Sequence, residues 1–597
     1  MSRLDVVLIH PPSVFDFRER PIFYGPISDV IPSSPLFEMY PVGFLTLAAA
    51  LRRNGYRVRI INLALLMMRS RRFRPERLLR RLKPRLFGID LHWLPHAHGG
   101  PALAKLLKQL HPEIPIIFGG ISATYFHEEL IRDEAVDFVL RGTVCEPSLL
   151  ALMRELEGDR HFRRVPNLTW KDDGVVHVNA PLAWTPSLDD YPFDLSMMVG
   201  DVVNRFDFHT NIPFESWWRH PITAVFTVRG CTRKCVSCGA SASSFHRFMP
   251  GCHPLLRSPD AIASAVRELA QLTRTPIFLV GDLLDGGDAY ANAVIDAMQR
   301  HPVSNRIIFE FFRPPSHAFI ERIEAAIPHW GAELSPESHD EHIRARFGKA
   351  TFTNAAMESS IEAMLASRCE ALDLFYLIGL PRQTVQSVLD TTGAIEHLFQ
   401  RFDRRLSAFI TPVGPFIDPG SDGFEEPERF GYILHARTLA EHRALLEQND
   451  WESILNYETQ WMSRKEIVDA TYAAAERLND LKERYGRIAP HIAAGVRARW
   501  ITARRIRREI AAHQQPLDAI RAFSQGTIND KAELFPPDAF LRNFRISGIV
   551  RLIIRSSAIS AAGFIRRGSR WIRRRLRSLR SKPANVTDLA VPRPRTT

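Results

Sequence analysis

The sequence predicts an α/β protein with two successive strand–helix regions and a helical C-terminal region. Short apolar runs of roughly four to eight residues alternate with helix-length segments over residues 1–180, and again over 221–425. Runs that are apolar throughout are typical of parallel strands covered by helices on both faces. Residues 426–545 carry helical patterns and charged stretches, so we expect a separate helical region there.

The first region should form a doubly wound domain. Because its strands are expected to be parallel, a ligand should lie at their carboxyl ends. A glycine at position 55 is expected to end the first helix. The expected strands are 5–12, 56–62, 86–93, 114–120 and 136–142, and the expected helices are 40–55, 100–112, 128–135 and 147–156.

Residues 181–220 are rich in proline and aromatic residues and show no clean periodicity. Such a composition is too aromatic for a disordered linker, so we expect a connector that packs over the surface.

The pattern of the second region predicts six strand–helix units, enough for a partial barrel. In such a barrel the reactive groups lie at the carboxyl ends of the strands. The expected strands are 222–228, 276–282, 306–312, 331–337, 371–379 and 406–413.

Three cysteines, Cys231, Cys235 and Cys238, form a C-x3-C-x2-C loop directly after the first of these strands. Three thiolates on one loop suit three corners of an iron–sulfur cube and leave the fourth iron open. The alternative is a zinc knuckle with Cys252 or His246 as the fourth ligand. Zinc sites usually join two pairs of ligands, and the sequence offers no second C-x2-C or H-x3-H.

This loop, placed after a strand, resembles the cluster loop of the radical S-adenosylmethionine (SAM) superfamily, although Ser237 stands where an aromatic residue is common. The resemblance implies a 4Fe-4S cluster whose open iron is chelated by SAM. It further implies that Gly281 and Asp282 contact the SAM amino group and that Ser335 and Glu337 contact its ribose. Gly379, Leu380 and Pro381 would let its adenine approach.

The N-terminal region resembles the cobalamin-binding domain that precedes many radical SAM barrels, the class B type. The similarity lies in the helix led by Tyr40-Pro41-Val42-Gly43 and in the Gly-Gly after the fourth strand. It implies a Rossmann-like domain in which Gly119 and Gly120 approach the nucleotide tail of cobalamin. The residues implied near the cofactor also include Ser122, Thr124, Gly142 and Glu146.

Several histidines follow strands of the N-terminal region. Asp90-Leu91-His92 matches half of the D-x-H-x-x-G motif that binds cobalt, but Pro95 replaces the glycine and the position in the fold differs. We therefore expect no cobalt coordination from that motif, and His10 is a weaker candidate. His92, His96 and His98 are interpreted as polar loop residues rather than metal ligands, because no acidic partner is interleaved.

In the barrel, Asp285, Glu310 and Arg313 lie near strand ends, and we expect ordinary surface ion pairs for them. Tyr376 is interpreted as a core aromatic rather than a hydrogen-atom relay.

The charge of the chain is concentrated at its C-terminus. Thirteen Lys and Arg and one acidic residue, Asp588, lie between Arg551 and Thr597, which accounts for the whole net charge of +12. The body therefore needs no polyanionic partner, and nucleic acid is not expected as one. In the segment 546–597, a narrow apolar stripe on a basic helix suits an anionic membrane surface. Nucleic-acid contact and docking on the protein's own acidic surface are the alternatives. The stripe consists of Ile554, Ala558, Ala561, Ile565, Ile572, Leu576 and Leu579.

No apolar run reaches the roughly 20 residues of a transmembrane helix, no signal peptide is evident, and six cysteines are too few for a disulfide scaffold. We expect a cytoplasmic protein, with a peripheral position on the inner face of the membrane as a further expectation.

The family resemblance implies an enzyme that uses a 4Fe-4S cluster, SAM and cobalamin to methylate an unactivated carbon of a small-molecule or lipid substrate, with an external electron donor. One alternative is a cyclase or rearrangement enzyme that uses both cofactors without methyl transfer. The other is a metal-cluster binding or regulatory protein at membranes.

Overall fold

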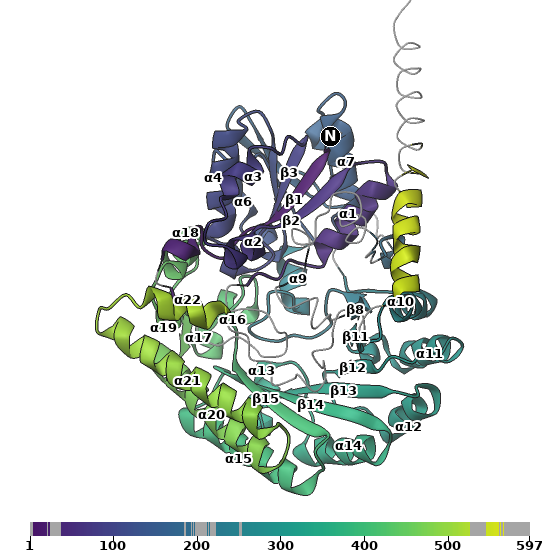
Figure 1. The fold of residues 1–597 in the computed structure, drawn as a ribbon, viewed down its shortest axis with the longest axis vertical. Helices are drawn as coiled ribbons and strands as arrows, with labels where there is room; N and C mark the ends of the chain where they lie inside the picture. Colours follow the sequence, from purple (N-terminus) through teal and green to yellow (C-terminus); the bar gives the residue numbers. More distant parts are fainter. Residues whose placement is uncertain are drawn as a thin grey trace, which may run out of the picture.

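The computed structural model confirms the α/β class and contains two large, mainly parallel sheets, of which the N-terminal one lies uppermost in Figure 1. The structure describes residues 4–20, 22–23, 37–183, 187–192, 194, 196, 212, 214, 223–249, 253–525, 545–559, 561–562 and 565. Most of the expected connector 181–220 therefore lies outside the described residues, as do Cys252 and the tail beyond Ile565.

The N-terminal sheet has seven strands in the order β2-β1-β3-β4-β5-β6-β7. The first five are parallel, as predicted, and every residue of β1 and β3 is buried because helices cover both faces. The strands are β1 (Val6–His10), β2 (Val58–Asn62), β3 (Leu86–Asp90), β4 (Ile116–Gly119), β5 (Phe138–Leu140), β6 (Leu168–Asp172) and β7 (Val175–Val178).

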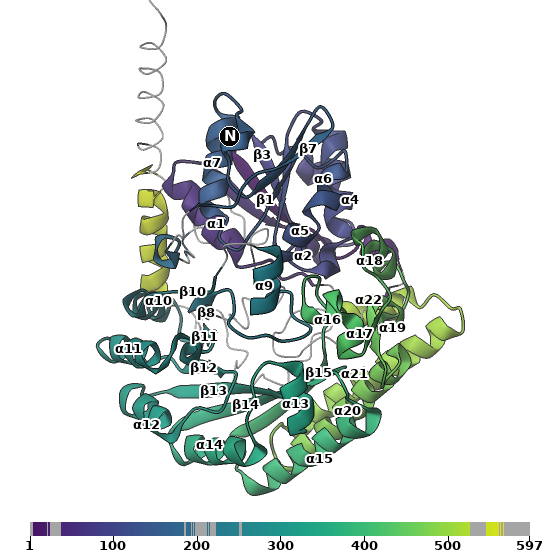
Figure 2. The ribbon, with the colours of Figure 1, turned by 180° about the vertical axis from the view of Figure 1, so that it is seen from behind.

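Helices flank this sheet on both sides, with α1 and α7 on one side and α3, α4 and α6 on the other (Figures 1 and 2). The helices are α1 (Gly43–Arg53), α2 (Leu63–Arg69), α3 (Pro75–Leu79), α4 (Gly99–Leu110), α5 (Ile121–Tyr125), α6 (His127–Arg132) and α7 (Glu146–Leu156).

The antiparallel hairpin of β6 and β7 was not among the predicted elements. Its turn contains Asp173 and Gly174, whose φ angles of 45° and 79° are those that a tight hairpin turn needs. An Asp-Gly pair between two short apolar runs is the sequence signal for such a hairpin.

The second sheet is the predicted six-stranded partial barrel, in the order β15-β14-β13-β12-β11-β8, with all neighbours parallel. Because β8 and β15 do not pair, the barrel stays open between them. Its strands are β8 (Thr223–Phe226), β11 (Ile277–Val280), β12 (Ile307–Phe311), β13 (Trp330–Glu337), β14 (Cys369–Ile378) and β15 (Leu406–Pro412), and a short pair β9 (Val228–Arg229) and β10 (Leu255–Leu256) follows β8.

Helices surround the outside of the barrel, and α9 lies between the barrel and the N-terminal region (Figure 2). They are α9 (Ala242–Phe248), α10 (Pro259–Leu272), α11 (Asp288–Gln299), α12 (His317–Ala326), α13 (Glu341–Phe347), α14 (Asn354–Ala366) and α15 (Val385–Arg401).

The C-terminal region is mainly helical, as predicted, and its long helix α20 packs against α15 and β15. Its elements are α16 (Asp422–Glu425), α17 (Pro427–Phe430), β16 (Tyr432–Leu434), α18 (Leu439–Leu446), α19 (Trp451–Ile454), β17 (Tyr457–Thr459), α20 (Arg464–Arg484), α21 (Pro490–Ala511) and α22 (Leu517–Gln525).

A last helix, residues 546–559, lies beside α1 and above α10 (Figure 1). Its Arg555 pairs with Glu268 of α10 at 2.6 Å. The Nη2 atom of Arg52, on α1, donates to the hydroxyl of Ser556 at 2.7 Å. The helix therefore bridges the two large regions of the molecule.

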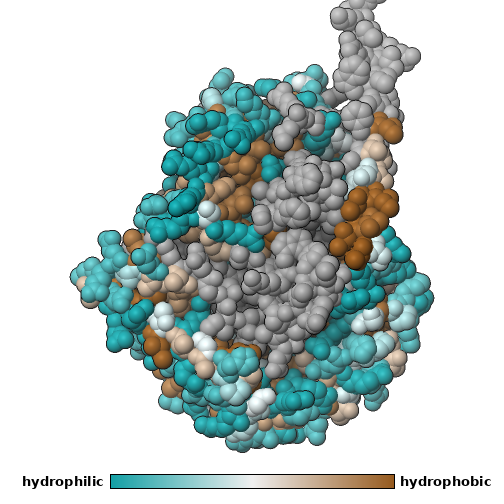
Figure 3. Space-filling view, viewed as in Figure 1, coloured by the Kyte–Doolittle hydropathy of each residue, from teal (hydrophilic) through white to brown (hydrophobic). Residues whose placement is uncertain are grey.

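The outer face of the 546–559 helix carries exposed Ile546, Val550 and Ile554, which form a hydrophobic patch visible in Figure 3. Among the described residues, no helix combines the length and apolar composition needed to cross a bilayer.

Candidate functional site

The three cysteines lie on one tight loop that follows β8 and β9. The N–H of Cys238 donates to the carbonyl of Cys235 at 3.2 Å, and the N–H of Ala242 donates to that of Arg233 at 2.8 Å. Cys231, Cys235 and Cys238 are free thiols and partly buried. The fold thus places them at the carboxyl end of the first barrel strand, where a βα barrel carries its chemistry.

The spacing of these thiols differs from that around a single ion. The three thiols do not all lie within 4.8 Å of one another. Within the part of the chain that the structure describes, a group of four other side chains does bring its donor atoms that close, and it is presented below. A zinc ion would draw its sulfurs closer, whereas the iron corners of a cube hold their thiolates farther apart. Of the two alternative fourth ligands for zinc, Cys252 lies outside the described residues and His246 is exposed on α9. The geometry therefore favours a cluster over a zinc knuckle.

Burial raises the pKa of all three thiols, that of Cys235 to about 12. The positive charge of Lys349 acts in the opposite direction on Cys235. Bound iron would stabilise the thiolates far more strongly than a lysine, because a metal cation is the largest local charge in such a site.

The loop is held on one side by α13. The N–H of Val236 donates to the carbonyl of Phe347 at 2.9 Å. Gly348, which ends α13 with a φ of 84°, lies so close that a Cβ atom there would sit 2.7 Å from the carbonyl oxygen of Lys234. Only glycine combines this conformation with this close approach.

On its other side the loop is tied to the N-terminal region through one carboxylate. Asp418, which follows β15, accepts from the N–H of Gly239 at 3.1 Å and from the indole N–H of Trp93 at 3.0 Å. Burial raises the pKa of Asp418 to about 6. Trp93 follows β3, so Asp418 links the cysteine loop to the carboxyl edge of the N-terminal sheet.

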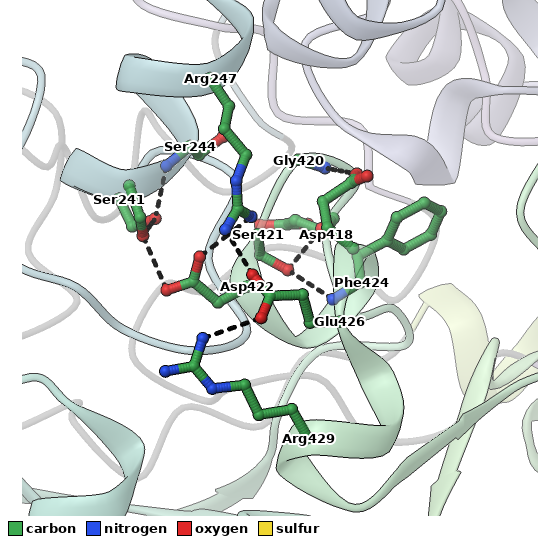
Figure 4. A network of polar contacts seen from close by, with 12 residues as sticks. Ser241, Ser244, Arg247, Asp418, Gly420, Ser421, Asp422, Phe424, Glu426 and Arg429 are labelled. Carbon is green, nitrogen blue, oxygen red and sulfur yellow. Dashed lines mark hydrogen bonds and ion pairs between the residues drawn. The ribbon is translucent and has the colours of Figure 1, made fainter.

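The helix after the loop, α9, is fixed by a network of ion pairs with α16 and α17 (Figure 4). Arg247 of α9 pairs with Asp422 at 3.1 Å and with Glu426 at 2.6 Å, and Arg429 also pairs with Glu426, at 2.8 Å. Ser421 caps α16 by accepting from the N–H of Phe424. These contacts join the cysteine loop to the first part of the C-terminal region.

At the end of β11, Gly281 and Asp282 are part of a buried turn. Gly281 has a φ of 101°, and its N–H donates to Glu310 at 2.6 Å. The two carboxylate oxygens of Asp282 accept from the N–H groups of Leu284 and Phe312, each at 2.9 Å. Burial raises the pKa of Asp282 to about 6 and that of Glu310 to about 7. The turn is thus rigid, and its predicted contact with SAM stays a prediction.

Glu337, at the end of β13, forms a buried ion pair with Lys349. Its φ of 65° is unusual for a residue with a side chain. Burial raises the pKa of Glu337, whereas the neighbouring carboxylate raises the pKa of Lys349 in spite of burial. The Lys349 Nζ atom lies 4.6 Å from the ring centre of Phe312. A single lysine after a helix gives no sequence signal, so the sequence did not predict Lys349.

The other residues predicted at the SAM site lie on the same edge of the barrel. Ser335 is half-buried on β13, and Gly379 ends β14 with a φ of 94°. A Cβ atom on Gly379 would lie 2.5 Å from the hydroxyl of Tyr457, so the room left by this glycine is filled by the protein itself. Leu380 and Pro381, which follow it, are buried. Their predicted role toward adenine stays untested.

Three predicted surface ion pairs have different outcomes. Asp285 pairs with Arg233 of the cysteine loop, in a mostly buried position. Glu310 is half-buried and accepts from the N–H of Gly281, so the expected surface ion pair is wrong for it. The guanidinium of Arg313 donates to a backbone carbonyl at 3.3 Å. Tyr376 is buried, as expected of a core aromatic, and its hydroxyl has no hydrogen-bond partner among the described residues.

An interdomain cavity of about 660 Å³ lies between the N-terminal sheet, the first barrel strand with α10, and the 546–559 helix. This volume is in the usual range, roughly 300–1,000 Å³, of sites for organic ligands. Its wall includes Pro41, Val42, Gly43, Gly88, Asp90, His92, Gly119, Gly120, Gly142, Glu146, Phe226, Arg229, Phe245, Ala265, Leu552 and Arg555.

The two glycines at the end of β4, Gly119 in the strand and Gly120 after it, have different surroundings. A Cβ atom on Gly120, whose φ is 118°, would lie 2.4 Å from the Cα atom of His92, so this glycine makes room for the protein's own chain. A Cβ atom on Gly119 would meet nothing closer than 3.9 Å. Gly119 is therefore the one that leaves space for a ligand.

The hydroxyl groups predicted near cobalamin face the protein. Thr124 donates to the carbonyl of Gly120 at 2.8 Å and accepts from the N–H of Gly142 at 3.0 Å, so it ties two turns of the cavity wall together. Ser122 is buried on α5 and is not among the cavity-lining residues.

Glu146 links the cavity wall to the barrel. Its buried carboxylate accepts two hydrogen bonds, both at 3.0 Å, from the Nη1 atom of Arg229 on β9. The sequence suggested Glu146 but gave no sign of Arg229, whose partner lies 83 residues away.

Four polar side chains gather at the carboxyl ends of β1 and β3. His10, Asp90, His92 and His96, called the histidine cluster below, form the close group of potential ligands mentioned above. The expectation that these histidines lack an acidic partner is wrong, because Asp90 contacts both His10 and His92. His98 lies apart and pairs with Glu447 at 2.8 Å.

Comparison with known proteins supports the assignment of both regions. Residues 29–148 match the B12 binding domain family. A cytidylyl-2-hydroxyethylphosphonate methyltransferase from Streptomyces wedmorensis is 24% identical over 250 residues, and an anaerobic magnesium-protoporphyrin IX monomethyl ester cyclase from Synechocystis is 23% identical over 138 residues. The matches cover 35% and 23% of this chain, but only 46% and 25% of those relatives.

Solved structures show the same fold at low sequence identity. The radical SAM methyltransferase TsrM from Kitasatospora setae, with cobalamin and a [4Fe-4S] cluster bound, matches with a TM-score of 0.54 and 15% identity, over 82% of this chain and 90% of that one. The cobalamin-dependent radical SAM enzyme OxsB with aqua-cobalamin matches with a TM-score of 0.50 and 12% identity, over 98% and 82%. Residues 29–148 therefore match a B12 binding domain, and the chain as a whole shares the fold of these two solved structures.

Proposed function

We propose that this chain is a cobalamin-dependent radical SAM enzyme that methylates an unactivated carbon of its substrate. The observation that carries this proposal is the position of the three-cysteine loop. It lies at the carboxyl end of the first barrel strand and is hydrogen-bonded through Asp418 to Trp93 of the B12-binding region. The cluster site and the cobalamin domain are thus parts of one hydrogen-bonded structure.

Cys231, Cys235 and Cys238 would hold three irons of a 4Fe-4S cluster, and the fourth iron would be left for SAM. When bound, the cluster, SAM and cobalamin would supply the electron, the radical and the methyl group for the reaction, and the first electron would come from an external donor. The protein's part is to hold these groups in place and to exclude water.

The barrel residues are arranged to do this. Glu310 fixes the N–H of Gly281, and Asp282 fixes the N–H of Phe312, so the turns on which SAM would lie are rigid before it binds. The mostly buried cation Lys349, which is paired with Glu337, lies close enough to Cys235 to favour its thiolate form.

The interdomain cavity fits the organic part of cobalamin that the family resemblance places at the Gly-Gly turn. It is largely apolar, and Gly119 opens onto it. Gly142 and Glu146 would form the wall on one side, and Arg229 and Phe226 of the barrel would form the other side.

The matched relatives favour methyl transfer but keep the alternative open. One is named a methyltransferase and the other a cyclase. The alternative is therefore a radical cyclisation or rearrangement that uses both cofactors without methyl transfer.

One experiment separates these functions. The protein is reconstituted without oxygen with iron, sulfide and cobalamin, then given SAM and a strong reductant. 5′-Deoxyadenosine and S-adenosylhomocysteine are measured by mass spectrometry. Methyl transfer predicts both products, and the alternative predicts deoxyadenosine alone. Neither product from a fully loaded protein would favour a binding or regulatory protein instead.

A matched pair of variants controls the experiment. Cys235→Ala should lose both products because the cluster loses a ligand. Lys234→Gln changes the neighbouring residue, which is exposed, and should keep both products. Products that survive Cys235→Ala would contradict the cluster assignment.

We further propose that the helix beginning at residue 546 lies on an anionic membrane, which suits a lipid-like substrate. Its exposed face carries Ile546, Val550, Ile554 and Ile565, while Arg551 and Arg555 contact α10. An apolar face beside a basic segment is typical of helices in the membrane interface.

This proposal is tested by co-sedimentation with vesicles. The protein should bind phosphatidylglycerol vesicles more strongly than phosphatidylcholine vesicles, and Ile554→Asp should weaken the binding. Ile433→Asp changes an exposed isoleucine in the distant β16 and is the matched control. Equal binding of the Ile554→Asp variant would contradict the proposal.

A further inference from the structure

The histidine cluster is assembled from two neighbouring strands. His10 ends β1 and Asp90 ends β3, and the two strands pair in parallel, so that Ile9 lies opposite Ile89. His92 and His96 follow β3 in the loop. One donor atom from each of the four cluster residues lies within 4.8 Å of the others, although 80 residues separate His10 from Asp90.

His10 turns one ring nitrogen to a backbone carbonyl and the other to a carboxylate. Its Nε2 atom lies 3.0 Å from the carbonyl oxygen of Phe37 and must donate, because a carbonyl only accepts. Its Nδ1 atom faces both oxygens of Asp90, at 3.1 and 3.2 Å. The Nδ1 lone pair cannot face a carboxylate alone, so either a proton on Nδ1 or a metal ion between the two groups supplies the positive charge.

His96 presents the same kind of lone pair. The backbone of Pro11 acts on the ring as a hydrogen-bond acceptor, because Pro11 has no N–H to donate. The Nδ1 atom of this buried side chain has no hydrogen-bond partner among the described residues. Nε2 is therefore the donor, and Nδ1 carries a buried lone pair without a donor.

Both histidines thus have the surroundings of metal ligands, in which one ring nitrogen donates to a backbone carbonyl and the other is presented to the ion. The Nδ1 atom of His92 lies 2.7 Å from the second oxygen of Asp90. We propose that His10, Asp90, His92 and His96 bind one divalent transition-metal ion of the zinc type. Three imidazoles and a carboxylate are a donor set that zinc favours.

The ion would form part of the wall of the interdomain cavity, because Asp90 and His92 line it. It would hold the ends of β1 and β3 together. Its two positive charges exceed the single negative charge of Asp90, so it would also make this side of the cavity positive. This centre is separate from the cysteine loop and does not depend on the proposed reaction.

The test uses the full-length, tag-free chain with its cluster and cobalamin reconstituted, so that the three cysteines are occupied. Zinc alone is added, loosely bound metal is removed by gel filtration with a weak chelator, and zinc is counted by mass spectrometry. We expect one zinc per chain, and a large loss, at least about tenfold in affinity, in Asp90→Asn and His96→Gln. His98→Gln, which changes a neighbouring histidine outside the cluster, should keep the zinc.

X-ray absorption at the zinc edge of the unaltered chain gives a second readout that does not depend on whether a variant folds. Nitrogen and oxygen ligands with imidazole scattering would support the site. Sulfur ligands, zinc at background level, or zinc retained by both Asp90→Asn and His96→Gln would overturn it.

Discussion

The cysteine loop and the histidine cluster occupy equivalent places in two different sheets. Both lie at the carboxyl ends of parallel strands, the first after β8 of the barrel and the second after β1 and β3 of the N-terminal sheet. Their donor atoms differ in spacing. Four atoms of the histidine cluster lie within 4.8 Å of one another, whereas the three thiols do not form such a group.

The charged groups beside the two sites differ, although carboxylates lie near both: Glu337 and Asp418 act on the thiols, and Asp90 contacts the histidines. The thiols, which become anionic as ligands, have the cation Lys349 within electrostatic reach. The imidazoles, which are neutral as ligands, surround the anion Asp90. The comparison teaches that the carboxyl edge of a parallel sheet suits two metal chemistries, and that donor type and donor spacing distinguish a candidate cluster site from a candidate single-ion site.

The largest expected effect is the loss of one centre while the other remains. Cys235→Ala should reduce bound iron from about four atoms per chain to near zero, because a cube with two protein ligands is not retained. Zinc in the histidine cluster should not change. Iron and zinc are counted in the same sample, and joint loss of both metals would break the distinction between the sites.

The second largest effect is expected on protein stability when Lys349, the cation beside the thiols, is replaced. Lys349→Met should destabilise the protein by about 3 kcal/mol, because it leaves the buried carboxylate of Glu337 without its partner. Urea unfolding followed by fluorescence measures this loss. The double variant Glu337→Gln with Lys349→Met should recover most of it, and a single variant as stable as the parent would contradict the role of the pair.

A smaller effect is expected at the histidine cluster. Gly120→Ala should cost about 2 kcal/mol and weaken zinc binding, because its φ is 118° and its Cβ atom would meet the backbone of His92. Gly119→Ala, which enters open space, is the matched control and should leave zinc binding unchanged. Thermal unfolding and zinc counting test both, and equal behaviour of the two variants would contradict this account.

The smallest expected effect is a change in pH dependence. Desolvation raises the pKa of half-buried Glu310 to about 7, so the folded state binds a proton more tightly than the unfolded state. The stability that this group contributes is therefore lost as pH rises from about 4.5 through about 7. Glu310→Gln should flatten this part of a Tm-against-pH curve. Glu321→Gln, an exposed carboxylate on α12, should not, and an unchanged slope in Glu310→Gln would contradict the assignment.

The same comparison explains how much the sequence could predict. The cysteine loop was recognisable because Cys231, Cys235 and Cys238 are contiguous and follow a strand. The apolar strands of both sheets were predicted because buried parallel strands are apolar throughout. The hairpin of β6 and β7 was missed although Asp173-Gly174 signals it.

Contacts between distant segments were beyond prediction from local patterns. His10 and Asp90 meet only because β1 and β3 pair in the sheet. Arg229, Lys349 and Asp418 have no local motif, since each acts through a partner supplied by another element. Ligand residues that are grouped in one loop could thus be predicted from the sequence, whereas ligand residues that only the sheet topology brings together could not.

The most direct test of the proposed function is whether SAM binds the cluster. The reduced, reconstituted chain is examined by electron paramagnetic resonance with and without SAM. We predict that SAM shifts the spectrum of the reduced cluster, because SAM should occupy the iron that the three cysteines leave open. A spectrum that SAM leaves unchanged, in a protein with its full iron content, would contradict the central claim.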